Sequence, residues 1–75
     1  MGLIDNLKII YPYEVVISTL GKDKRTRRRA IMAWCYENGI WDYDISYGYN
    51  DESGTIISLR LAELDDYMIA YLNFT

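Results

Sequence analysis

The chain has 75 residues, 51% of them hydrophobic, with a formal net charge of −3, one cysteine and no histidine. A chain this short forms one domain, residues 1–75, and buries only about 60–65% of its unfolded surface. A single cysteine excludes a disulfide within the chain, and one thiol without histidine argues against a zinc site. We therefore expect no metal and no other cofactor.

Several classes of function are also disfavoured. Without histidine the chain lacks the usual general base near neutral pH. Cys35 lies in an apolar helical context and is expected to be a buried, reduced thiol rather than a nucleophile. No glycine-rich phosphate loop, signal peptide or membrane span is visible. We predict a non-enzymatic, soluble protein of the cytoplasm, without catalytic residues and without membrane contact.

The first half of the chain predicts a strand followed by a helix. Residues 1–11 are compatible with a helical turn or an extended lead-in, and Pro12 suits the entrance of a strand. Residues 13–19 are rich in β-branched side chains and predict the first strand. A helix is predicted over residues 26–38, with Asp23 or Thr26 as N-cap and Gly39 as the C′ residue.

Helical periodicity divides this helix into two faces. Ala30, Ile31, Trp34 and Cys35 fall on one side, and Trp34 is the expected anchor of the core. The opposite face carries Arg29, Met32, Ala33 and Tyr36.

Residues 41–49 alternate strictly between large apolar or aromatic side chains and small or acidic ones. This period of two predicts a half-buried strand, with residues 55–61 as its partner across the loop 50–54. Tyr43 and Tyr47 are expected to point into the core beneath the helices.

The loop length predicts the register of this hairpin. A five-residue loop sets Tyr49 opposite Thr55 and Asp44 opposite Arg60 on the outer face. A shift of two residues would place Asp42 opposite Arg60 instead. Either register gives Arg60 an acidic neighbour, which supports the hairpin.

The C-terminal segment is ambiguous between helix and strand. A helical stripe fits residues 61–72, but apolar residues also alternate over residues 68–74. We favour a short second helix over residues 63–67 followed by a final strand. The predicted fold is then α+β, a small two-layer β-α-β-β-α-β sandwich of the ferredoxin-like type.

The segment from Thr55 to Phe74 contains Leu59, Leu61, Asp65, Asp66, Met68, Ala70, Leu72 and Phe74. With these residues the segment resembles small uncharacterised accessory proteins of tailed bacteriophages, in which a strand leads into an acidic one-turn helix and an alternating strand. The Trp34–Cys35 pair also resembles such chains, whereas Tyr67 departs from the small residue expected there. The resemblance implies a viral accessory protein, located in the host cytoplasm, that inhibits a host machine, counters a defence or joins the virion. It implies no catalytic residue.

The charges are strongly segregated, because six of the eight basic residues lie between positions 22 and 29. Positive charge at a helix N-terminus opposes the macrodipole by a few tenths to about 1 kcal/mol per residue. Local helix stability therefore does not explain the cluster, and either acids elsewhere in the fold or a ligand must neutralise it. The candidate acids are Asp42, Asp44, Glu63, Asp65 and Asp66.

Eight tyrosines are too many for so small a core, and exposed tyrosine beside arginine is typical of protein-binding hot spots. We therefore predict a protein-interaction module that binds and occludes a host or virion protein. The first predicted surface is the basic helix start with its outer stripe, Lys24, Arg25, Arg28, Arg29, Met32 and Tyr36. The second is an acidic sheet face that could imitate nucleic acid, Asp42, Asp44, Asp51 and Glu52.

Two alternatives stay open. The basic helix start could bind the nucleic-acid backbone, although the expected open sheet face is acidic and its aromatic residues are expected under the helices. The charge separation also permits head-to-tail or twofold self-association, as in a structural or assembly subunit, and this would stabilise so short a chain.

Overall fold

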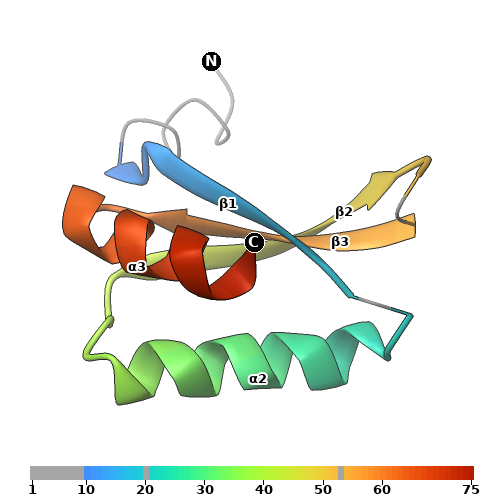
Figure 1. Cartoon of the computed structure of the whole chain (residues 1–75), viewed down its shortest axis with the longest axis horizontal. Coiled ribbons are helices and arrows are strands. Elements are labelled where there is room, and N and C mark those ends of the chain that lie inside the picture. The colour runs from blue at the N-terminus through green and yellow to red at the C-terminus, as the bar shows by residue number, and fades with distance from the viewer. Residues whose placement is uncertain (1–9, 20, 53) are drawn as a thin grey trace.

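The computed structural model describes residues 10–19, 21–52 and 54–75, and Figure 1 shows how its elements are arranged. The expected lead-in lies mostly at residues 1–9, outside the described residues. Within the described ranges the elements are β1 (Tyr13–Ser18), α2 (Lys24–Glu37), β2 (Tyr43–Asn50), β3 (Gly54–Leu61) and α3 (Leu64–Phe74). The chain is a small α+β domain with the order β-α-β-β-α.

The three strands form one antiparallel sheet in the order β1-β3-β2. Since β1 and β2 are both antiparallel to β3, they are parallel to each other, and α2 connects them in a split β-α-β unit. The five-residue hairpin register is confirmed, with Tyr49 opposite Thr55 and Asp44 opposite Arg60. The structure thereby excludes the alternative register, shifted by two residues, that alternation also allowed.

Helix α2 begins at Lys24, two residues before the predicted start, and ends at Glu37, one residue before the predicted end; both ends carry capping signals that are visible in the sequence. Asp23 is the N-cap, and its carboxylate accepts a hydrogen bond from the Thr26 backbone N–H at 3.2 Å. At the other end Gly39 adopts a φ of 70° and donates to the Tyr36 carbonyl, while Ile40 donates to the Cys35 carbonyl at 2.9 Å. This pair of bonds is a Schellman motif, which requires a left-handed residue at the position of Gly39.

The predicted final strand over residues 68–74 is wrong, because α3 is a single helix as far as Phe74. No glycine or proline follows Tyr67 to end the helix and reverse the chain, and the first turn-favouring residue after it, Asn73, comes too late to start a strand at residue 68. The helical arrangement also buries Ala70 and stacks Tyr67 on Tyr13 of β1, with ring centroids 5.5 Å apart. The ferredoxin-like order therefore lacks its fourth strand, and the second helix is longer than expected.

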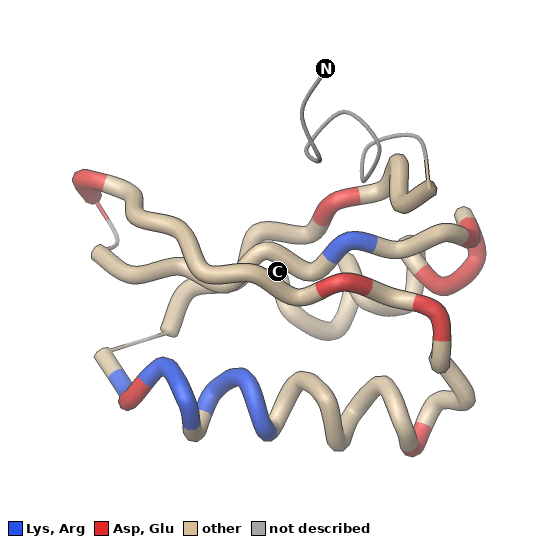
Figure 2. The backbone as a smooth tube through the Cα atoms, turned by 180° about the vertical axis from the view of Figure 1, so that it is seen from behind, with Lys and Arg blue, Asp and Glu red and all other residues tan. Residues whose placement is uncertain are grey.

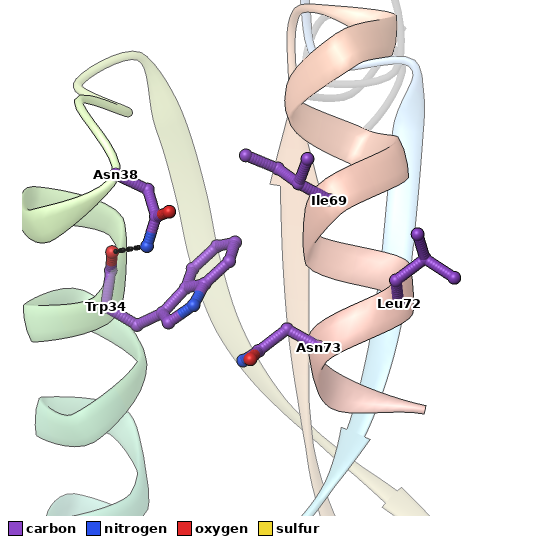
Figure 3. Close-up of a pocket in the computed structure, with 5 residues that line it drawn as sticks. All are labelled: Trp34, Asn38, Ile69, Leu72 and Asn73. Carbon is purple, nitrogen blue, oxygen red and sulfur yellow. Dashed lines mark hydrogen bonds between the residues drawn. The ribbon is translucent and has the colours of Figure 1, made fainter.

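Both helices lie on the same face of the sheet, side by side and running in opposite directions (Figures 1 and 3). Within the described ranges, neither has the length and apolar character needed to cross a membrane. Between helices and sheet lies a core of Val15, Ile17, Ile31, Cys35, Ile40, Ile57, Leu59, Leu61 and Ala70.

Several sequence-based expectations about burial are wrong. Trp34 is half-buried at the border of this core, where it meets Phe74 of α3 edge to face, and Ala30 is exposed. Tyr47 is 44% exposed although it lies on the helix-facing side of β2. Tyr47 is exposed because the sheet twists and carries the hairpin end of β2 away from α2 (Figure 1).

Candidate functional site

The basic residues of α2 lie on its N-terminal half, and no acidic residue stands in its first turn. Arg27 serves the fold, because its Nε donates to the Ser18 carbonyl at 3.3 Å and its guanidinium lies 5.8 Å from the ring centre of Phe74. Most of the other cations project from the surface of the helix, as the exposure of Lys24, Arg25 and Arg29 shows. Arg27 therefore belongs to the packing between α2 and α3, and its neighbours are the candidates for binding.

Three of these arginines surround a hollow between α2 and the diverging end of β2. Arg25, Arg28 and Arg29 line it together with Tyr47, and its volume is about 310 Å³. Lys24 lies at the same place, with its Nζ 5.0 Å from the centre of the Tyr47 ring. We refer to these five residues as the basic cleft.

The cations of the basic cleft have no acidic partner among the described residues. The one ion pair that the described residues form lies elsewhere, on the outer face of the sheet, where it joins Arg60 Nη2 to Glu14 Oε2 at 3.0 Å. None of the five carboxylates expected to neutralise the cluster forms an ion pair with it. The positive charge is therefore uncompensated at short range, and an anionic ligand would gain from entering the cleft.

The effect of this charge reaches the neighbouring strand. Burial raises the pKa of the Tyr43 hydroxyl, and the Cys35 thiol adds to this rise, whereas the positive charge of Arg28 opposes it. Arg28 is itself half-buried. It is thus the least exposed of the five residues of the basic cleft.

The remaining predicted binding residues extend the surface along α2. Met32 is half-buried, while Tyr36 is 67% exposed and meets Trp41 edge to face at 5.0 Å. Trp41 is itself 70% exposed, because β2 begins only at Tyr43. From Arg25 to Tyr36 the surface runs about 16 Å along the helix, at about 1.5 Å per residue. The structure therefore places a basic cleft at one end of this stripe and an exposed aromatic pair at the other.

The four residues of the predicted acidic face occupy two separate places. Asp42 and Asp44 lie at the start of β2, where Asp42 accepts a hydrogen bond from the Tyr11 hydroxyl at 2.8 Å. Asp51 and Glu52 lie in the turn after β2, where the Glu52 N–H donates to the Asn50 side chain. The two pairs are about 23 Å apart along the strand, at about 3.3 Å per residue.

Figure 2 shows the resulting distribution of charge. Apart from Arg60, which lies on β3 beside acidic residues, the described basic residues lie just before α2 and in its N-terminal half. Acidic residues gather mainly at the opposite end of the molecule, with a second small group at the hairpin turn. The charge separation visible in the sequence is thus a separation in space.

Cys35 is buried, as its place on the helix predicts. Burial raises the pKa of its thiol to about 11, and the negative charge of Asp66 contributes a smaller rise. The thiol is therefore protonated at neutral pH.

Two residues of the candidate surface, Tyr47 and Trp41, were not predicted from the sequence, because strand alternation assigned both to the core. The alternation correctly indicates which face a side chain occupies, but not whether a helix covers that position. Comparisons of this chain with protein-family models, with curated proteins and with solved structures found no match.

Proposed function

We propose that this protein is a non-enzymatic interaction module that binds an acidic surface of a partner protein. The contact surface consists of the basic cleft and the Tyr36–Trp41 pair. The observation that carries the proposal is the absence of any ion pair between the cleft cations and an acid among the described residues. Cations that neither stabilise their own helix nor pair within the fold are available to a ligand.

The chemistry of this surface suits a protein partner. Arginine forms bidentate hydrogen bonds with carboxylates, and three guanidinium groups around one hollow can receive an acidic side chain from several directions. Tyrosine, tryptophan and arginine are the residues enriched in the energetic centres of protein interfaces. Acidic groups elsewhere on the molecule would repel the same partner, so the orientation of binding is also constrained.

The sequence resemblance to phage accessory proteins favours a host or virion protein as that partner. Binding alone would then be sufficient for function, because a small domain seated on a partner blocks access to the surface that it covers. This mechanism requires no catalytic group.

A second candidate is binding to the backbone of single-stranded nucleic acid. It is favoured by Tyr47 and Tyr49, which are exposed at the hairpin end of β2 rather than buried under the helices. Cations beside exposed aromatic rings can contact phosphates and stack bases. The expectation that the aromatic residues of this strand lie under the helices therefore does not hold for Tyr47 and Tyr49, and their rings are accessible to bases.

A pull-down from host lysate with three proteins tests the proposal: the wild type, Arg29→Glu/Tyr36→Ala, and the control Lys22→Glu/Tyr49→Ala. The control makes the same change of charge and removes one exposed tyrosine outside the proposed surface. We expect the wild type and the control to retain the same protein, and the first variant to lose it. Equal retention by all three proteins would show that the partner binds elsewhere.

Fluorescence anisotropy with a polyglutamate peptide and with a random single-stranded oligonucleotide separates the two candidates. The proposed function predicts that the peptide binds at low salt and that Arg29→Glu weakens it. Binding of the oligonucleotide alone, with an affinity that falls steeply with salt, would favour the second candidate. If neither probe binds at low salt, the basic cleft does not serve an anionic partner.

A further inference from the structure

Helix α3 presents an unusually apolar surface to solvent. Ala70, Tyr67 and Phe74 face the rest of the fold, but five large apolar side chains on the same helix are exposed, and Leu72 is 77% exposed. No charged side chain occurs from Tyr67 to Thr75. Contiguous exposed apolar surface of this kind marks interaction sites. The exposed residues, which we call the α3 apolar surface, are Leu64, Met68, Ile69, Tyr71 and Leu72.

A groove of about 340 Å³ between α2 and α3 borders this surface. Its lining contains no charged residue, and it is formed by Trp34, Asn38, Ile69, Leu72 and Asn73. Figure 3 shows Ile69 directed towards α2 and Leu72 directed away from it. The same region therefore offers both a hollow and a projecting apolar side chain, which is what a surface needs to pair with a copy of itself.

The charges around α3 favour a second copy in one orientation. Glu63 and Asp65 stand at the N-terminal end of α3, whereas Arg27 of α2 lies beside Phe74 at its C-terminal end. If two α3 helices pack antiparallel, the acidic end of each meets the basic end of the other, and the helix dipoles are also opposed. Parallel packing would instead bring the acidic ends together.

We propose that the α3 apolar surface is the interface of a twofold homodimer in which the two α3 helices pack antiparallel. A twofold contact uses the same surface on both copies, and only the residues at its centre, on the symmetry axis, meet their own counterparts, so a surface without charge at its centre avoids self-repulsion. The surface and groove involve fewer residues than the roughly 20–30 per partner of a stable complex. We therefore expect a weak dimer. This interface does not depend on the basic cleft.

Sedimentation velocity over a range of concentrations tests the interface with the wild type, Leu72→Glu and Tyr49→Glu. Leu72 and Tyr49 are 77% and 74% exposed, so the two substitutions add the same charge at equally exposed positions on different elements. We expect the wild type to dimerise, Leu72→Glu to weaken the dimer at least about tenfold, and Tyr49→Glu to leave it unchanged. Circular dichroism checks that Leu72→Glu keeps its helices.

Oxidative cross-linking tests the orientation. Cys35 is buried, so a cysteine introduced at an exposed position is the reactive thiol. Antiparallel packing predicts more disulfide in a mixture of Leu64→Cys and Leu72→Cys chains than in either variant alone. A predominance of disulfides between two Leu64→Cys chains would contradict this orientation. A wild type that stays monomeric at about 1 mM, or a Leu72→Glu variant that dimerises as well as the wild type, would overturn the proposal.

Discussion

Arg60 on the central strand has an acidic residue directly opposite it on each side, Glu14 on β1 and Asp44 on β2. Its guanidinium pairs with Glu14, and the same carboxylate oxygen accepts a hydrogen bond from the Ser58 hydroxyl. Ser58 is buried, with 9% of its surface exposed. Replacing Glu14 by alanine therefore removes an ion pair and leaves a buried hydroxyl without its acceptor, whereas replacing Asp44 removes neither interaction.

The expected cost follows from these two interactions. The ion pair contributes about 0.2–1 kcal/mol, because the Glu14 side chain is 39% exposed and solvent screens the charges. The unsatisfied hydroxyl of Ser58 costs about 1–3 kcal/mol. We therefore expect Glu14→Ala to lower the free energy of unfolding by about 1–4 kcal/mol, out of a total of about 4–11 kcal/mol for 75 residues. For Asp44→Ala the expected change is within about 0.5 kcal/mol.

Urea denaturation followed by far-ultraviolet circular dichroism measures both changes as shifts of the midpoint at constant slope. In thermal unfolding each kcal/mol corresponds to about 4–8 °C in Tm for a domain of this size. Double-mutant cycles with Arg60→Ala isolate the pair interactions: the Glu14 cycle should show coupling of about 0.5–1 kcal/mol and the Asp44 cycle none. If Asp44→Ala costs as much as Glu14→Ala, the assigned pairing is wrong.

Three further predictions concern the ends of the helices and the buried thiol. Gly39→Ala should destabilise the fold by about 1–2 kcal/mol in urea, because its φ of 70° disfavours a side chain; an unchanged midpoint would show that the cap tolerates a Cβ. Cys35 should react with iodoacetamide slowly at pH 8 when folded and rapidly in urea, and equal rates would contradict its burial. Because its folded pKa of about 11 lies above the ordinary value of 9.0, the unfolded chain ionises first, so stability is intact below pH 9 and falls between about pH 9 and 11. Phe74→Ala should cost about 1–3 kcal/mol in thermal unfolding, because this half-buried ring packs against Trp34; a smaller loss than for exposed Tyr71→Ala would contradict that role.

Local sequence signals were sufficient for the elements whose geometry depends on near neighbours. Alternation and loop length predicted the hairpin and limited it to two registers, and the capping signals placed the start of α2 at Asp23 or Thr26 and its end just before Gly39. The segregation of basic residues into one half of α2 also follows from the sequence. These features could be predicted because each depends on residues close together in the chain.

Tertiary structure decided the features that depend on how the helices pack on the sheet and on which strand positions they cover. Residues 68–74 fit both a helical and a strand pattern, and the sequence favoured the strand, but packing of Tyr67 on Tyr13 and of Phe74 on Trp34 favours the helix. Tyr47 became part of the basic cleft because the sheet twists away from α2. The sequence alone indicated that local helix stability does not explain the cluster of cations on α2. Only the fold showed that, among the described residues, no acid comes close enough to pair with them, because ion pairing depends on distances between segments that the chain order does not specify.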